Sequence, residues 1–244
     1  MTKRERYLAF CNFQPVDRVP RRASYIDSLR KKLTEKLGKD PMKYFDMDIG
    51  MGAGLARPDS YKLPDYSGYH PGRTHGKDGF TIDANGCGHL MHGFHHFTEY
   101  ISPLRNTERF EELESYPFVS NKGWSDDKMR KACETAHAQG LPAVVGTGHM
   151  YENAWQVRGY EAFLTDLLTQ RDWAEFILDK FNTNHLRTAE AAGRAGYDCL
   201  QIADDVANQN AMMFSPALWR EVMKPRWARV IAAARAFKPD IHVW

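Results

Sequence analysis

The second half of the chain alternates short apolar runs with long helical patterns. Apolar runs stand at 141–146, 199–203 and 241–244. Short, nearly all-apolar runs are typical of strands that are buried on both faces of a parallel sheet. The helices expected between and around them cover residues 129–140, 153–168, 172–195 and 215–237. This alternation predicts an α/β fold, either an open doubly wound sheet or a (β/α)8 barrel.

The first half of the chain predicts two helices and two strands. Thr2 and Glu5 have the spacing of a capping box, which indicates an opening helix. Leucines recurring on one face, followed by a glycine, predict a second helix over residues 27–38. Short apolar stretches predict strands over Val19–Ser24 and Asp48–Gly52.

Residues 56–125 have a different texture, rich in Pro, Gly, Tyr and His and without helical periodicity. Within them, residues 78–101 predict a strand, a turn at Asn85-Gly86 and a second strand. We interpret 56–125 as an irregular insertion with a β-hairpin, inside a single domain that covers residues 1–244.

Composition excludes several classes of protein. The 244 residues are 43% hydrophobic and carry a net charge of +2, so neither a nucleic-acid nor a membrane partner is expected. No apolar run is long enough to cross a bilayer, and the opening MTKRERYLAF lacks the core of a signal peptide. Four scattered cysteines indicate reduced thiols in a cytoplasmic protein.

Two adjacent carboxylates, Asp204 and Asp205, stand where the apolar run 199–203 ends. Reactive groups of parallel α/β folds gather at the carboxyl ends of strands. Successive strand residues face opposite ways, so one aspartate is expected to face the site and the other the helices. The structural alternative is that one caps a loop and the other is solvated. Asn208 and Gln209 add neutral hydrogen-bonding groups nearby.

A second candidate cluster follows the glycine-rich exit of the preceding strand. His149 begins it, and Tyr151, Trp155 and Arg158 come at spacings that place them on one helix face. That face could stack on a flat ligand and bind an anion. The structural alternative is a packed aromatic group with a surface arginine.

The segment CGHLMHGFHH concentrates side chains that can bind metals. Its five candidates are Cys87, His89, His92, His95 and His96. Alternation along a hairpin sends His89 and His92 to opposite faces, and no second ligand pair follows at zinc-finger spacing. We therefore interpret this segment as a polar hairpin and expect no metal ligand in it. The GMGAG stretch at 50–54 lacks the spacing of a dinucleotide site.

Three separated motifs, in this order, resemble the uroporphyrinogen decarboxylase-like superfamily. They are TKRERYLAFCNFQPVDRVP, GHMYENAWQVRGYEAFLTDL and LQIADDVANQNAMMFSPALWREVMKPRWARVIAAARAFKPDI. The resemblance implies a (β/α)8 TIM barrel. Members include uroporphyrinogen decarboxylases, which act in porphyrin biosynthesis and need no cofactor for the decarboxylation. They also include corrinoid- or thiol-linked methyltransferases, which use zinc.

Departures from the decarboxylase pattern favour the methyltransferase-like members. Arg21 and Arg22 are adjacent and come earlier than the arginine pair that would grip substrate carboxylates. No aspartate stands near Leu55, and Trp155 and Asp205 replace an expected tyrosine and serine. The resemblance thus implies an enzyme that moves a methyl group between a small molecule or corrinoid and an acceptor. A uroporphyrinogen decarboxylase, a lyase, and a non-catalytic truncated barrel are the alternatives.

The expected strands account for about five of the eight in such a barrel. We therefore expect a truncated barrel that is inactive alone. The zinc-binding His-x-Cys that the resemblance implies would begin past Trp244, so no metal or cofactor is expected within this chain. The expected partners are a small-molecule substrate and a protein-bound corrinoid, with room for a homodimer. The expected catalytic residues are Asp205 and then Asp204, and the expected substrate-binding residues are His149, Tyr151, Trp155, Arg158, Asn208 and Gln209.

Overall fold

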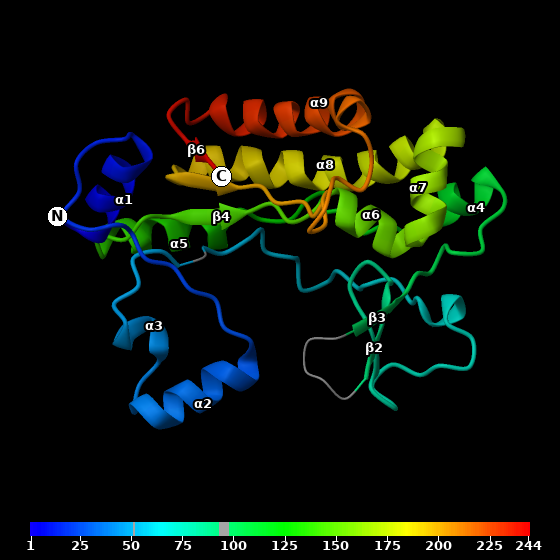
Figure 1. Ribbon diagram of the computed structural model, residues 1–244, viewed down its shortest axis with the longest axis horizontal. Helices are drawn as coiled ribbons and strands as arrows, with labels where there is room; N and C mark the ends of the chain where they lie inside the picture. Colours follow the sequence, from blue (N-terminus) through cyan, green and yellow to red (C-terminus); the bar gives the residue numbers. More distant parts are fainter. Residues whose placement is uncertain (51, 93–97) are drawn as a thin grey trace.

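The protein has a mixed α/β fold, seen in a computed structural model that describes residues 1–50, 52–92 and 98–244 (Figure 1). Its helices are α1 (Lys3–Cys11), α2 (Asp27–Leu37), α3 (Pro41–Tyr44), α4 (Phe110–Ser115), α5 (Asp127–Ala138), α6 (Tyr151–Arg158), α7 (Tyr160–Thr169), α8 (Arg171–Ala195) and α9 (Pro216–Arg235), with a 3₁₀ turn, η1 (Ser67–Tyr69). Its strands are β1 (Phe80–Ile82), β2 (Gly88–Met91), β3 (Thr98–Ile101), β4 (Val144–Gly146), β5 (Cys199–Gln201) and β6 (His242–Val243).

A parallel sheet in the order β4-β5-β6 forms the centre of the fold. Val144 pairs with Cys199, which pairs in turn with His242. Side chains alternate across the sheet: Val145 and Leu200 pack into the core shared with helices α8 and α9. Val144 and Cys199 face the other way, against Tyr7 of helix α1. The sheet is therefore covered on both faces, as its continuous apolar runs predicted.

Local signals in the sequence explain where the helices begin and end. The Thr2–Glu5 capping box is present in full at the start of α1. Ser215 accepts a hydrogen bond from the backbone N–H of Leu218 and begins α9 with Pro216 at its first position. The single helix expected over 153–168 is instead two helices, because Gly159 has φ +101° between them.

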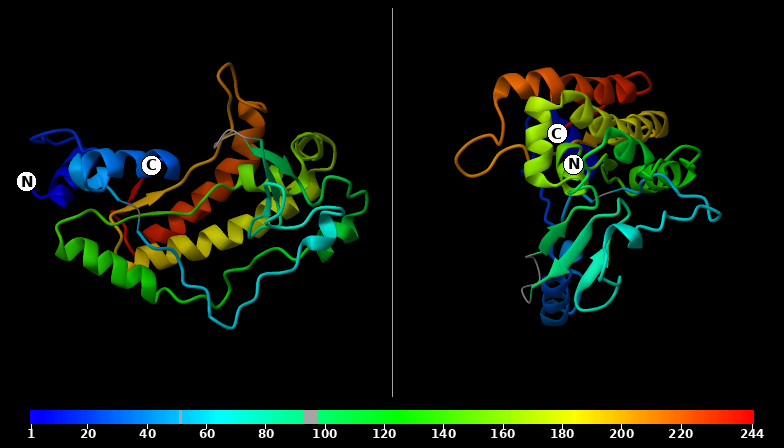
Figure 2. Two further views of the ribbon diagram at one scale, coloured as in Figure 1. Left: turned by 90° about the horizontal axis from the view of Figure 1, so that it is seen from below. Right: turned by 90° about the vertical axis from the view of Figure 1, so that its right-hand side faces the viewer.

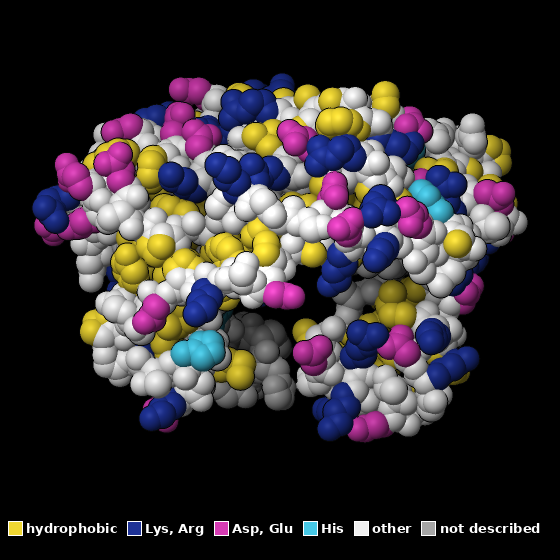
Figure 3. All heavy atoms as spheres, turned by 180° about the vertical axis from the view of Figure 1, so that it is seen from behind, with side chains coloured by type: hydrophobic (Ala, Val, Ile, Leu, Met, Phe, Trp, Pro, Cys, Tyr) yellow, Lys and Arg dark blue, Asp and Glu magenta, His cyan; other side chains and the backbone are white. Residues whose placement is uncertain are grey.

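A separate antiparallel sheet, β1-β2-β3, confirms the predicted hairpin and adds a third strand. Gly86 lies in the turn with φ +84°. A Cβ there would lie 2.1 Å from the hydroxyl oxygen of Tyr116. The turn therefore requires glycine both for its positive φ and because there is no space for a Cβ. Figure 3, seen from behind, shows this sheet and the α2–α3 segment as two lobes below the helical layer.

One predicted strand was wrong, and a second was not observed in its described residues. Residues 19–24 are not assigned to a strand. Pro20 has no N–H to donate, although the carbonyl of Arg21 accepts the N–H groups of Asp48 and Ile49. The strand expected over 48–52 includes Met51, which lies outside the described residues. Its described residues form no strand, although the N–H of Gly52 donates to the carbonyl of Val144.

The two sheets of the described chain stay separate, and neither closes into a barrel. The expected TIM barrel is thus observed only as a mixed α/β fold with three parallel strands. In the described part of the chain, no helix combines the length and apolar character needed to cross a bilayer.

Candidate functional site

Asp204 caps helix α6 from the end of strand β5. Its carboxylate oxygens accept hydrogen bonds from the backbone N–H groups of Tyr151 at 2.8 Å and Glu152 at 3.1 Å. These N–H groups have no partner within the helix, and the helix dipole favours a negative charge there. Burial nevertheless raises the pKa of Asp204 to about 6, outweighing the hydrogen bonds that lower it. One of the two aspartates thus has a capping contact, as the structural alternative proposed.

Asp205 is exposed at the same strand exit, and its carboxylate lies within electrostatic reach of Tyr100 on strand β3. Burial, followed by the negative charge of Glu152, raises the pKa of the Tyr100 hydroxyl, and the charge of Asp205 adds to this shift. The antiparallel sheet therefore brings the Tyr100 phenol within electrostatic reach of Glu152 and Asp205.

Helix α6 adds an imidazole–carboxylate pair and an aromatic wall. Nδ1 of His149 lies 2.9 Å from a carboxylate oxygen of Glu152, and both side chains are partly exposed. The Trp155 ring packs edge-on against Tyr100, with ring centroids 5.3 Å apart, and its buried Nε1 has no hydrogen-bond partner among the described residues. His149, Glu152 and Trp155 thus surround the exit of strand β4 with groups that can move a proton or stack on a ligand.

Arg158 and Tyr151 do not face an open ligand site. The Arg158 guanidinium is buried, donates to Asp166 at 2.7 Å and to the carbonyl of Leu104 at 2.7 Å, and lies over the Trp173 ring. This differs from both sequence-based interpretations, an anion-binding arginine and a surface arginine, because the guanidinium is buried and donates through Nε and Nη1 within the protein. Tyr151 is fully buried in the main core, and its hydroxyl contacts Met213.

Asn208 and Gln209 lie on an exposed loop after strand β5. Oδ1 of Asn208 accepts the N–H groups of Asn210 and Ala211 at 2.9 Å and 3.0 Å, which builds the loop's own turn. In both views of Figure 2 this orange segment projects away from the helices. A substrate contact by these two amides stays a prediction.

His185 is a buried residue near the site that the sequence did not single out. It is 4% exposed and stacks on Trp227 with ring centroids 5.4 Å apart. Its Nδ1 has no hydrogen-bond partner in the part of the chain that the structure describes. A Cβ on Gly148, at the exit of β4, would lie 3.7 Å from its Nε2. Burial, with the neighbouring His149, lowers the pKa of His185 to about 4. In the sequence it is one polar position within a long helical pattern.

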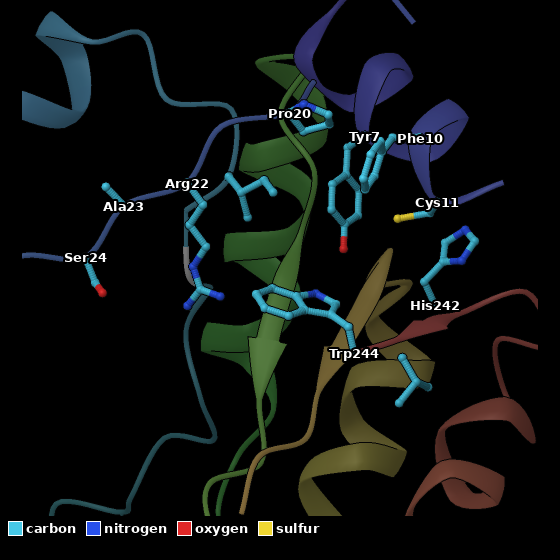
Figure 4. A pocket seen from close by; sticks show the side chains of 11 residues that line it. Tyr7, Phe10, Cys11, Pro20, Arg22, Ala23, Ser24, His242 and Trp244 are labelled. Carbon is cyan, nitrogen blue, oxygen red and sulfur yellow. The ribbon is translucent and has the colours of Figure 1, made fainter. Parts of the chain in front are cut away.

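A cavity of about 660 Å³ opens on the α1 side of the parallel sheet (Figure 4). Arg22 and Trp244 point toward each other across it, and the guanidinium carbon lies 4.7 Å from the Trp244 ring centroid. Arg22 also donates to the Gln201 side chain at 3.3 Å. Arg21 faces away, toward Asp46 at 3.6 Å. Only one arginine of the adjacent pair therefore lines this cavity.

The raised pKa of Asp204 predicts a dependence of stability on pH. The folded-state pKa of about 6 exceeds the ordinary value of 3.8, so folding favours the protonated carboxyl. This contribution is fully present below pH 3.8 and is lost as the pH rises through 6, by at most about 3 kcal/mol. We expect Asp204→Asn to flatten the change between pH 4.5 and 7.5, measured by urea unfolding of both proteins. Equal pH dependence in the two proteins would exclude this role.

Comparisons with known proteins agree with this fold. The model of the family described as Uroporphyrinogen decarboxylase (URO-D) matches residues 95–244. A solved methyltransferase from Methanosarcina mazei is similar in structure, with a TM-score of 0.56 and 19% sequence identity. That similarity covers 96% of this chain and 67% of the methyltransferase chain. Among curated proteins, none matches this chain.

Proposed function

Because the chain belongs to the URO-D family, we propose that it is a methyltransferase-like member with the TIM-barrel architecture, of which the described sheet forms one part. The reaction would move a methyl group between a small molecule or a protein-bound corrinoid and an acceptor. The departures of the sequence from the decarboxylase pattern at Trp155 and Asp205 support this choice. The structural neighbour is itself named a methyltransferase, and its low identity limits that support to the fold.

The observation that carries the proposal is the division of roles between Asp204 and Asp205. Along strand β5, Leu200 packs among the helices, whereas Cys199 and Gln201 face the α1 side. Asp204 lies on the same side of the chain as Leu200, because it caps helix α6. We infer that Asp205 lies on the same side as Cys199 and Gln201, which is the side of the sheet that the Arg22 cavity occupies.

Each exposed group at the strand exits has a chemical role in this proposal. Asp205 orients the acceptor or takes the proton that the acceptor loses when it is methylated. The His149–Glu152 pair is the second route for that proton. Trp155 and Tyr100 form an aromatic wall against which a flat or methylated substrate packs.

The thiolate-containing zinc ligand set that the resemblance implies is not found among the groups that we assign to this site. The groups that we assign here are two carboxylates and one imidazole, without the thiolate that the family resemblance implies. We therefore derive no step through zinc at the strand exits. Zinc held elsewhere in a longer protein, and a corrinoid held by a partner, both remain compatible with these roles.

The experiment compares Asp205→Asn with Asp204→Asn, because asparagine keeps the shape and removes the charge. Methyl transfer from methylcobalamin to a small thiol is followed in the cobalamin spectrum, with release of carbon dioxide from uroporphyrinogen as a parallel assay. Loss of a charged hydrogen bond to substrate costs roughly 1.5–3 kcal/mol, so Asp205→Asn should lower kcat/KM at least about tenfold. Its melting temperature should stay close to that of the wild type.

Asp204→Asn is the matched control, and we expect it to change stability more than turnover. Full activity of Asp205→Asn together with inactivity of Asp204→Asn would reverse the assignment. Full activity of both variants would remove the aspartates from the site. Decarboxylation without methyl transfer would identify a decarboxylase instead, and no turnover in either assay would support a non-catalytic barrel.

A further inference from the structure

Three metal-binding side chains converge where strand β1 turns into strand β2. One ligand atom from each of Asp83, Cys87 and His89 lies within 4.8 Å of the other two. Oδ2 of Asp83 is 2.9 Å from Nε2 of His89. Cys87 is fully buried, while the side chains of Asp83 and His89 are 31% and 26% exposed. The cluster thus has a buried thiol at its base and an open side.

The turn itself fixes the position of this cluster. Oδ1 of Asp83 accepts the backbone N–H groups of Asn85 at 2.8 Å and Cys87 at 3.0 Å. Its second carboxylate oxygen is left to face His89. The His89 ring is held from its other side by Tyr100, with ring centroids 5.2 Å apart. Two of the three ligands are therefore oriented without any ion.

We propose that Asp83, Cys87 and His89 form a zinc-binding site. Thiolate, imidazole and carboxylate are the ligands that zinc takes, at about 2.0–2.3 Å. Ligand atoms of one tetrahedral zinc ion are then about 3.3–3.8 Å apart. The ligand atoms of Asp83, Cys87 and His89 lie up to 4.8 Å apart, so side-chain rotations that move them by about 1 Å bring them to this spacing. A soft thiolate also disfavours calcium and magnesium, which take oxygen ligands.

Coordination requires loss of the Cys87 proton. Burial raises the pKa of the thiol to about 12, so without metal the group is protonated at neutral pH. Its sulfur has only long contacts to carbonyl oxygens, 3.6 Å to Gly88 and 3.9 Å to Ile101. Binding would form a zinc–sulfur bond and release the thiol proton to solvent. With three protein ligands, the fourth position stays open to water on the exposed side.

This inference differs from the expectation of a polar hairpin, and the difference comes from Asp83. Alternation does separate His89 from His92, whose Nε2 lies 2.8 Å from Glu99 instead. The third ligand stands before the turn, outside the histidine-rich segment. His95 and His96 lie outside the described residues and are not included in the site.

Zinc titration of the reduced, chelator-treated chain tests the site directly. We expect about one zinc per chain, with about one proton released, measured by calorimetry in buffers of different ionisation enthalpy at pH 7.5. Cobalt(II) should give a thiolate-to-metal charge-transfer band. Cys87→Ser and His89→Ala should each weaken binding by more than about tenfold, since even an outer-shell partner typically costs that much.

His92→Ala is the matched control, because His92 is paired with the carboxylate of Glu99 on strand β3 but does not belong to the three-residue cluster. It should bind zinc like the wild type. Absence of one-equivalent binding, a cobalt spectrum without the thiolate band, or equal losses in His92→Ala and His89→Ala would overturn the proposal. If Cys87→Ser does not fold, the thiolate-to-cobalt band of the wild type still tests the thiolate ligand, and its absence counts against the site. These readouts do not depend on methyl transfer.

Discussion

Replacing Arg158 with alanine should lower the free energy of unfolding by about 3–5 kcal/mol. The guanidinium and the Asp166 carboxylate are both buried and lie 2.7 Å apart. Removing Arg158 leaves a buried carboxylate without its partner and frees the carbonyl of Leu104, which links helix α6 to the segment before α4. Urea unfolding at pH 7 measures the loss.

A double variant separates a structural arginine from a ligand-binding one. Arg158→Met with Asp166→Leu removes both charges and keeps apolar volume, so it should recover most of the lost stability. If Arg158→Ala instead unfolds like the wild type and only weakens binding of an anionic substrate, the role expected from the sequence is right and the buried pair is unimportant.

Asp198→Ala should cause a loss of similar size, about 3–5 kcal/mol, for a different reason. Its buried carboxylate joins three elements that are distant in sequence. It accepts from Arg4 of helix α1 at 2.8 Å and from the N–H of Ala143 at 2.9 Å, and lies 2.9 Å from Nε2 of His137. Alanine leaves the Ala143 N–H unpaired beside the parallel sheet.

The pKa of Asp198 supplies a second readout. Burial by itself raises this pKa, but Arg4, the Ala143 N–H and His137 outweigh it and hold the pKa below its ordinary value. The stabilisation is therefore present above the unfolded-state pKa and is lost as the pH falls through the lower folded-state value. Asp240→Ala is the control, since its exposed pair with Lys238 should be worth less than about 1 kcal/mol. Equal losses in both variants would contradict the assignment.

Much of the second half of the fold could be predicted, because its signals are local. Ser215-Pro216 begins a helix through its own side chain and ring, and the runs 199–203 and 241–244 each contain a parallel strand. The strand expected over 19–24 failed because a strand exists only where a neighbour pairs with it. The backbone contacts of Arg21 with Asp48 and Ile49 are made with another segment, so the sequence of residues 19–24 alone could not predict them.

The sequence indicated which segments carry the candidate site, but not the tertiary contacts that their side chains make. Alternation predicted that Asp204 and Asp205 face opposite ways. The structure gives Asp204 the contact with helix α6 and leaves Asp205 exposed. The approach of Tyr100 depends on how the antiparallel sheet packs on α6, a contact between segments more than 50 residues apart. The internal partners of Arg158 are likewise tertiary contacts, so helical spacing alone could not reveal them.

The contact between Arg4 and Asp198 spans 194 residues and has a consequence for the order of folding. On the ribosome, helix α1 emerges first, yet strand β5, which carries its partner, is made much later. Tyr7 and Ile49 pack against β5, so their side chains stay exposed to solvent until β5 has been synthesised. Closing so long a loop also makes this docking step slow compared with pairing of the β1–β2 hairpin. We therefore expect the antiparallel sheet to form early and the amino-terminal helix to be among the last elements to dock.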